Sequence, residues 1–402
     1  MYQINEDVVY VKGAVNGAIY DFNTEKVYSI NQSACDILDR YVVEKNINAD
    51  RDYLDMLSRN NLISDIFKPQ YYKPPINDAV KLEMAWIEVT QKCNMKCIHC
   101  YEGNDHYGFN DTLSLAQWKN VIRQLVDAGI NRLIIIGGEP ACYSNIIEII
   151  DYISDLNIDV TLFTNATCFS KELFNCVVKN NINVKVSIYG HNAQVHDMIT
   201  QMPGSFDKMI HWVEKLIFCN INVSSAVIIM KENQEYLNDI IHFVKETGMK
   251  YSRYDTIREV YGGTQTPHVP TNMDILNNVY FTKPNFRTSK EKFIESLCHN
   301  TCWYGKISIM ENGDVIPCEF EREYIYGNVL CNTIDEIIHS KRTLSKWFFD
   351  FSKIDECKDC EFRFACSDCR PLGRAVCGDI RTKNPRCCYD VYSGKFKKIE
   401  IK

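Results

Sequence analysis

The middle of the chain alternates between short apolar runs and longer segments in which apolar residues recur every three or four positions. The short runs are typical of buried strands and fall at Met84–Val89, Arg132–Ile136, Ile158–Thr164, Val184–Ile188, Val223–Ile229 and Tyr251–Ile257. The longer segments predict amphipathic helices over Ser114–Ala128, Asn145–Leu156, Lys171–Lys179, Phe206–Cys219 and Glu235–Thr247. This regular succession predicts parallel βα units and hence an α/β fold.

The first eighty or so residues follow a different pattern. Three short alternating runs with tight turns between them predict strands at Val8–Lys12, Gly17–Phe22 and Lys26–Ile30. Helical patterns follow at Gln32–Val43 and Asp50–Asn60, and the proline-containing stretch Lys68–Pro75 reads as an extended linker. We therefore expect a small separate unit ahead of the βα region.

Composition narrows the class of protein. The chain has 402 residues, 46% of them hydrophobic, which is enough for a large core in two or three domains. Its net charge of −7 and the lack of a basic block argue against nucleic acid and acidic membranes as partners. The N-terminus shows no export signal and no apolar run is long enough to span a bilayer, so we expect a cytoplasmic protein. Nineteen cysteines then make better sense as ligands than as disulfides.

Three of these cysteines follow the first apolar run directly. Cys93, Cys97 and Cys100 have the spacing Cys-x3-Cys-x2-Cys, which can hold three irons of a [4Fe–4S] cluster and leave the fourth iron open. A structural zinc loop is the alternative, but His99 is the only obvious further ligand nearby. The second apolar run ends in the motif Gly137-Gly-Glu-Pro140, where glycine lets the backbone approach a ligand closely.

These two motifs, in this order, resemble the radical S-adenosylmethionine (SAM) superfamily. The resemblance implies a partial (β/α)6 radical SAM barrel in which the cluster on Cys93, Cys97 and Cys100 is catalytic. SAM would chelate the open iron, and the reduced cluster would cleave it to methionine and a hydrogen-abstracting 5′-deoxyadenosyl radical. The cofactor-binding positions would be Tyr101, Gly137, Gly138, Glu139 and Pro140, with Glu139 accepting a hydrogen bond from the SAM ammonium. Because ligands of such folds lie at the carboxyl ends of the strands, we add Thr164, Asn165, Ser187 and Tyr189.

Eleven of the nineteen cysteines fall between Cys298 and Cys388. Their spacing resembles the SPASM domain, a cysteine-rich C-terminal extension of radical SAM enzymes that carries two auxiliary [4Fe–4S] clusters. The resemblance assigns the first cluster to Cys302, Cys318 and Cys369, and the second to Cys357, Cys360, Cys366 and Cys387. Only two residues separate Cys366 from Cys369, where the family usually has three. The segment Lys306–Cys318, with its Asn-Gly turn, predicts a hairpin.

Several points in the cysteine-rich region stay open. Cys298 is the candidate fourth ligand of the first auxiliary cluster, which otherwise has an open iron able to bind a substrate thiolate. Cys388 competes with Cys387, and zinc ribbons are the alternative to iron–sulfur clusters, since Cys-x2-Cys pairs suit both metals. The remaining cysteines have no ligand spacing, although Cys142 and Cys377 are candidate hydrogen donors near the radical.

The N-terminal pattern resembles the small winged-helix domain that recognises leader peptides, close in kind to the chaperone of pyrroloquinoline quinone biosynthesis. A small stabilising domain without a ligand is the alternative. The predicted domains are thus 1–75 for peptide recognition, 82–290 for the radical SAM barrel and 291–402 for the SPASM domain.

Together the resemblances imply a maturase of ribosomally made precursor peptides. It would bind the leader, take electrons from a reductant such as flavodoxin or ferredoxin, and form a thioether or carbon–carbon cross-link. Epimerisation of the peptide is an alternative reaction for the same kind of enzyme. Formylglycine formation, as in anaerobic sulfatase maturases, is a second alternative enzymatic function. An inactive electron carrier or peptide-binding scaffold is the alternative outside enzymes.

Overall fold

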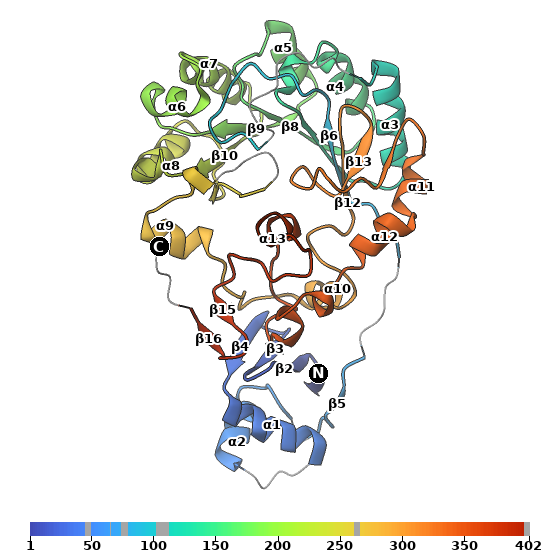
Figure 1. The fold of residues 1–402 in the computed structure, drawn as a ribbon, viewed down its shortest axis with the longest axis vertical. Helices are drawn as coiled ribbons and strands as arrows, with labels where there is room; N and C mark the ends of the chain where they lie inside the picture. The colour runs from blue at the N-terminus through green and yellow to red at the C-terminus, as the bar shows by residue number, and fades with distance from the viewer. Residues whose placement is uncertain (45–49, 65, 74–78, 102–111, 261–265, 398–402) are drawn as a thin grey trace. The chain divides into compact units, whose positions relative to one another are not determined.

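The computed structural model describes residues 1–44, 50–64, 66–73, 79–101, 112–260 and 266–397 (Figure 1). It divides into two compact units, neither of which is continuous in sequence. The first unit contains Met1–Ala79, Phe281–Tyr304 and Lys346–Lys402, and the second contains Val80–Tyr280 and Gly305–Ser345. The three consecutive domains expected from the sequence stay a prediction.

The second unit is built on a nine-stranded sheet (Figure 1). Six of its strands are parallel neighbours in the order of the sequence: β6 (Met84–Glu88), β7 (Arg132–Ile136), β8 (Asp159–Thr164), β9 (Asn183–Ile188), β10 (Val223–Ile229) and β11 (Tyr254–Thr256). Each corresponds to one of the predicted apolar runs. Such runs are nearly continuous because parallel strands are covered on both faces.

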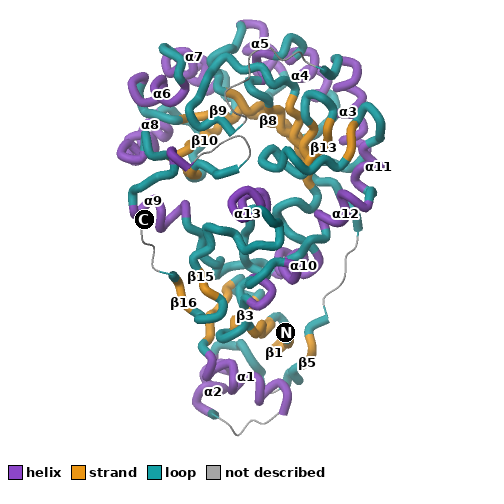
Figure 2. Tube along the Cα trace, in the orientation of Figure 1, coloured by secondary structure: helices purple, strands orange, loops and turns teal. Residues whose placement is uncertain are grey.

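Helices cover the outer face of this sheet, as Figure 2 shows in purple against orange. They are α3 (Leu115–Asp127), α4 (Ile146–Ser154), α5 (Lys171–Lys179), α6 (Ala193–Thr200), α7 (Ser205–Phe218) and α8 (Leu237–Glu246). Helix α4 shows the logic, since its isoleucines at 146, 149, 150 and 153 form one buried stripe. Helix α3 begins at Ser114, whose side chain and that of Gln117 form a capping box. The sequence predicted five of these helices and missed α6.

The predicted C-terminal hairpin is present and extends the same sheet. Strands β12 (Lys306–Ile309) and β13 (Asp314–Ile316) pair antiparallel around Gly313, whose φ of 89° is readily available to glycine. Strand β12 also pairs in parallel with β6, and β14 (Gly327–Asn328) closes the edge beside β13. Short helices α9 (Met273–Ile275) and α11 (Ile334–Ile338) belong to this unit as well.

The first unit contains a five-stranded antiparallel sheet in the order β4-β3-β2-β1-β5. Strands β2 (Val8–Lys12), β3 (Gly17–Asp21) and β4 (Lys26–Ile30) were predicted, whereas β1 (Tyr2–Asn5) and β5 (Gln70–Tyr71) were not. Helices α1 (Gln32–Glu44) and α2 (Arg51–Arg59) follow as expected. The stretch predicted as a linker thus contributes β5, and its residues 74 and 75 lie outside the described part of the chain.

Both faces of this small sheet are buried. Val8, Tyr10 and Ile19 pack with Leu38 of α1 and Leu54 of α2. The alternate positions Val9, Val11, Ala18 and Tyr20 face the other way and pack against Phe293, Phe362, Phe364 and Tyr389. The cysteine-rich C-terminal segment therefore shares a hydrophobic core with the N-terminal strands. Its regular elements are α10 (Lys290–Cys298), α12 (Lys341–Trp347), α13 (Arg370–Cys377), β15 (Tyr389–Asp390) and β16 (Lys395–Phe396).

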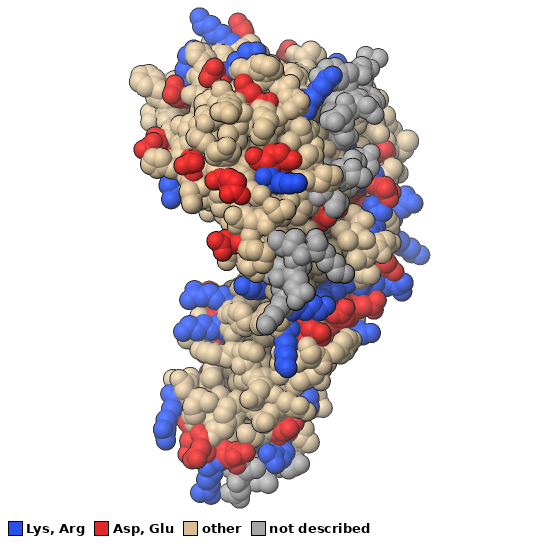
Figure 3. Space-filling view, turned by 60° about the vertical axis from the view of Figure 1, so that its left-hand side comes forward, with Lys and Arg blue, Asp and Glu red and all other residues tan. Residues whose placement is uncertain are grey.

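Figure 3 shows basic and acidic side chains on the drawn face of each unit. Among the described residues, no helix combines the length and the apolar character needed to cross a bilayer.

Candidate functional site

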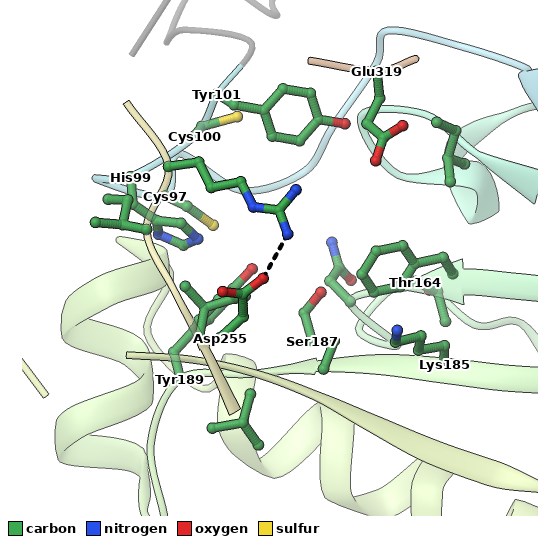
Figure 4. A pocket seen from close by; sticks show the side chains of 18 of the residues that line it. Cys97, His99, Cys100, Tyr101, Thr164, Lys185, Ser187, Tyr189, Asp255 and Glu319 are labelled. Atoms are coloured by element: carbon green, nitrogen blue, oxygen red, sulfur yellow. Dashed lines mark hydrogen bonds and ion pairs between the residues drawn. The ribbon is translucent and has the colours of Figure 1, made fainter. Parts of the chain in front are cut away.

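The carboxyl ends of the six parallel strands surround a pocket of about 430 Å³ in the second unit (Figure 4). Each strand β6 to β11, or the segment directly after it, contributes lining residues, and Glu319 and Phe320 beyond the hairpin complete the wall. The volume is in the range of pockets that hold a cofactor-sized molecule. This is the end of a parallel α/β sheet at which ligands bind.

The three-cysteine loop forms one side of this pocket. Cys93, Cys97 and Cys100 all line it, and Figure 4 shows Cys97 and Cys100 on the side opposite Thr164 and Lys185. Backbone hydrogen bonds from Lys96 and Ile98 to the carbonyls of Thr200 and Ile199 tie the loop to the end of α6. Burial raises the pKa of the Cys97 thiol, and the neighbouring cysteines raise it further. A metal cluster would supply the positive charge that such thiolates need.

His99, the ligand considered for zinc, also lines the pocket and is half-buried, with its Nδ1 atom buried. Burial lowers the pKa of its imidazole to about 3, so the ring is neutral. It packs edge-on against the ring of Tyr189 at a centroid distance of 4.5 Å.

Gly137 and Gly138 pack directly against the backbone that leads into the cysteine loop. A Cβ atom at position 137 would lie 2.5 Å from the Thr90 carbonyl oxygen, and one at position 138 would lie 2.6 Å from that of Lys92. In return, the Gly138 and Glu139 N–H groups donate to the Thr90 and Lys92 carbonyls at 2.9 and 2.8 Å. Only glycine fits at these two positions, which hold the cysteine loop against the end of β7.

Glu139 is a buried carboxylate with an exposed fraction of 1%. It accepts hydrogen bonds from the Thr164 hydroxyl at 2.5 Å, the Asn165 N–H at 2.7 Å and the Ala141 N–H at 3.1 Å. Burial raises the pKa of Glu139, and these hydrogen bonds oppose the increase. Among the described residues, no basic side chain forms an ion pair with Glu139. A ligand ammonium would therefore find a complementary charge here.

A network of polar side chains joins the cysteine loop to the end of β8. The Asn165 amide donates to the side-chain oxygen of Asn94 at 2.9 Å, and the Asn94 amide donates to the Thr167 hydroxyl at 2.7 Å. Thr167 in turn donates to the Asn165 side-chain oxygen at 2.7 Å. Asn165 thus connects Glu139 with the cysteine loop. The sequence did not single out Asn94 or Thr167, which carry no spacing motif.

The pocket brings together nearly all the cofactor-binding positions predicted from the sequence. Those that line it are Tyr101, Gly137, Gly138, Glu139, Thr164, Asn165, Ser187 and Tyr189. Burial raises the pKa of the Tyr189 phenol well above its ordinary value. Pro140 is different, because it is buried at the start of a 3₁₀ turn and is not among the lining residues.

The pocket lining also carries charged groups that the sequence did not predict. Asp255 and Arg258 form an ion pair at 2.8 Å, drawn as the dashed line in Figure 4. The Arg258 guanidinium lies 4.9 Å from the centre of the Phe320 ring. Burial lowers the pKa of Lys185 and raises that of Glu319. These charged groups can position a polar substrate that carries both hydrogen-bond donors and acceptors.

Four of the predicted auxiliary ligands, Cys357, Cys360, Cys366 and Cys387, lie in the first unit. Burial raises the pKa of Cys366 well above that of an ordinary thiol, with Cys387 and Cys357 adding to the effect. Burial likewise raises the pKa values of Cys357 and Cys360, each with another cysteine of this set among its causes. These thiols are therefore within electrostatic reach of one another. The thiol of Cys388 points elsewhere and donates to the Thr282 carbonyl at 3.3 Å.

The other predicted set is divided between the units. Cys298, Cys302 and Cys369 belong to the first unit and Cys318 to the second. Cys298 is the last residue of α10, and Cys369 is the cap residue before α13. This set stays a prediction.

Among the described residues, no three His, Cys, Asp or Glu side chains already form a group that could hold a metal ion. The donor chemistry nevertheless fits a cluster with bound SAM at the strand ends. Three cysteines share a pocket with two glycines that accept no side chain and with a buried carboxylate lacking a cation.

Two family models match the chain. The radical SAM superfamily matches residues 87–244, and the SPASM family, an iron–sulfur cluster-binding domain, matches residues 298–361. Both resemblances expected from the sequence are confirmed. Neither model reaches the N-terminal strands, so the leader-recognition domain stays a prediction.

Individual curated proteins are also similar to this chain in sequence. The subtilosin biosynthesis protein AlbA of Bacillus subtilis is 26% identical over 71% of this chain and 66% of its own length. The chain thus spans just under two thirds of that relative. An AdoMet-dependent heme synthase of Methanosarcina barkeri is 24% identical over 76% of this chain and 96% of its length.

Among solved structures, Streptococcus suis SuiB bound to its precursor peptide SuiA has the same fold. It matches with a TM-score of 0.59 at 15% identity and covers 96% of this chain and 99% of SuiB. The two family models thus assign a radical SAM domain to residues 87–244 and, C-terminal to it, a SPASM iron–sulfur cluster-binding domain to residues 298–361.

Proposed function

We propose that this protein modifies a ribosomally made precursor peptide by radical SAM chemistry. The observation that carries the proposal is the convergence of Cys93, Cys97, Cys100 and buried Glu139 in one pocket at the strand ends. A [4Fe–4S] cluster with bound SAM, held by these residues, would supply the radical chemistry that abstracts a hydrogen atom from the substrate.

The chain's own residues then have distinct roles. Cys93, Cys97 and Cys100 would hold the cluster, and Glu139 would accept a hydrogen bond from the SAM ammonium. Gly137 and Gly138 let the backbone after β7 approach the segment that leads into the cysteine loop, which would hold the cluster ligands close to Glu139. The charged groups that line the pocket, Lys185 and the Asp255–Arg258 pair, would orient the peptide substrate.

The likeness to AlbA, a bacteriocin biosynthesis protein, and to SuiB bound to a precursor peptide supports a peptide as substrate. The products we expect are thioether or carbon–carbon cross-links. Two auxiliary clusters, one on Cys357, Cys360, Cys366 and Cys387 and one on Cys302, Cys318 and Cys369 with Cys298, would accept an electron or hold a substrate thiol. A flavodoxin or ferredoxin would supply the reducing electron.

The small antiparallel sheet offers a place for the leader peptide at the edge of β4. The Val27 N–H points outward from this edge, where it donates to the Phe286 carbonyl at 2.9 Å. Since directions alternate along a strand, the N–H and carbonyl groups of Ser29 also point outward. An extended leader could add to the sheet here by backbone hydrogen bonds.

The test measures 5′-deoxyadenosine formed from SAM under strong anaerobic reduction. The Cys97→Ala variant should abolish it, whereas Cys219→Ala, at a half-buried cysteine without ligand spacing, should leave it unchanged. Undiminished SAM cleavage by Cys97→Ala would reject the assignment of the cysteine loop.

The similarity to AdoMet-dependent heme synthases favours a second candidate function, modification of a tetrapyrrole. The two candidates differ in what stimulates the reaction. A precursor peptide should accelerate SAM cleavage if the substrate is a peptide, and an iron porphyrin should do so if it is a tetrapyrrole.

A further inference from the structure

Two cysteines outside every predicted cluster lie next to one another near the pocket. The Sγ atoms of Cys142 and Cys168 are 3.6 Å apart, although the residues are separated by 26 positions in sequence. Cys142 ends the 3₁₀ turn that follows β7, and Cys168 lies in the loop that follows β8. Both thiols are half-buried, and neither is among the residues that line the pocket.

The separation is short enough for a covalent bond after a small movement. A disulfide has an S–S length of about 2.05 Å, so the sulfurs would approach by roughly 1.5 Å, which side-chain rotation with slight loop movement can supply. Both loops are already anchored at Glu139: the Cys142 N–H donates to its carbonyl at 2.9 Å, and the Asn165 N–H donates to its carboxylate at 2.7 Å. The fold therefore holds the two thiols next to each other without a covalent bond between them.

The two thiols differ in their surroundings. The Cys142 S–H donates to the Cys168 sulfur, and this hydrogen bond is the main cause that lowers the pKa of Cys168. Burial and the charge of Glu139 oppose this lowering of the Cys168 pKa, whereas the Thr167 side chain and the positive charge of Lys208 add to it. The same hydrogen bond and burial raise the pKa of Cys142. Cys168 is thus the more readily ionised thiol of the pair, and Cys142, with its sulfur 3.6 Å away, is placed to resolve a bond formed on it.

We propose that Cys142 and Cys168 form a reversible thiol–disulfide site that reacts with low-molecular-weight disulfides. The Cys168 thiolate attacks a disulfide RSSR, forms a mixed disulfide and releases one RS⁻. The Cys142 thiol then loses its proton and attacks the Cys168 sulfur, releasing the second RS⁻. In sum, two cysteine thiols and RSSR give one protein disulfide and two RSH, and two electrons pass to RSSR.

The test equilibrates the anaerobic, cluster-loaded enzyme with buffers of reduced and oxidised glutathione. After an acid quench, free thiols are blocked with N-ethylmaleimide, and the protein is digested without reduction. We expect a peptide pair joined through Cys142 and Cys168 that becomes the main form of both residues as the oxidised fraction rises. Exposed Cys331 and Cys377 should carry only glutathione.

Single variants test the assigned roles. Cys142→Ser should leave a stable mixed disulfide between glutathione and Cys168, whereas Cys168→Ser should slow modification of Cys142 at least tenfold. Absence of the joined peptides while Cys331 and Cys377 are glutathionylated would overturn the proposal. Equally fast reaction of Cys142 in Cys168→Ser would overturn the order of attack.

Discussion

The replacement of Glu139 by glutamine tests the assignment of the SAM site most sharply. The amide keeps the size of the carboxylate but removes its charge and one of its acceptor oxygens. Because Glu139 is 1% exposed and has no cationic partner among the described residues, the charge is available to a bound ammonium. A hydrogen bond to a charged group contributes about 1.5–3 kcal/mol. We therefore expect the Kd for SAM to rise roughly 10- to 150-fold.

The assay is isothermal titration of SAM into the anaerobic enzyme without reductant. Asp21→Asn is the matched control, because Asp21 is also a buried carboxylate that accepts bonds from one hydroxyl and one backbone N–H but lies in the first unit. Its SAM affinity should equal that of the wild type. If Glu139→Gln binds SAM within twofold of the wild type, the proposed contact between Glu139 and the ammonium is wrong.

Three further predictions concern other positions in the chain. Gly138→Ala should lower the iron content and abolish SAM cleavage, because the added Cβ would collide with backbone carbonyls. Gly373→Ala is the control and should change neither, because its Cβ would lie 3.4 Å from the nearest atom. Ser29→Pro removes one outward N–H from the edge of β4, so it should weaken leader binding at least tenfold in a fluorescence titration. Peptide-independent SAM cleavage should stay unchanged. Equal leader affinity would contradict the proposed binding of the leader at this edge. Burial raises the pKa of Glu311 to about 7, so the folded state holds a proton that the unfolded state has lost. Stability should therefore fall as the pH rises from about 5.5 to 7, and Glu311→Gln should flatten the melting temperature over this range; an equal slope in the variant would contradict this.

The elements of the second unit were predictable because its parallel strands are buried on both faces and read as apolar runs. Helix α6 was missed because it is short and half of its residues are polar, which weakens the periodic signal. Strand β5 was missed because two exposed residues carry no pattern. The parallel pairing of β12 with β6 joins segments more than two hundred residues apart, and no local pattern encodes such a contact.

The residues of the candidate site also fall into two groups, those that sequence motifs indicate and those that only the fold brings to the pocket. The cysteines Cys93, Cys97 and Cys100 form one short motif and Gly137, Gly138 and Glu139 another, so the resemblance to a known family nominated them from the sequence. The Asp255–Arg258 pair and Glu319 reach the pocket only through the fold, and isolated charges have no signature in sequence. Cys142 and Cys168 had one usable signal, since each follows the carboxyl end of one of two neighbouring strands, but that requires knowing that β7 and β8 are adjacent.

The central claim is that the substrate is a ribosomally made peptide. Its most direct test is the accurate mass of a short peptide encoded beside this gene and co-expressed anaerobically with the enzyme. A loss of two hydrogens per event, absent with Cys97→Ala, is the result we predict. A mass that is unchanged in water but gains deuterium in heavy water would replace cross-linking by epimerisation. No change in either solvent would contradict the assignment of that peptide as substrate and turn attention to the tetrapyrrole.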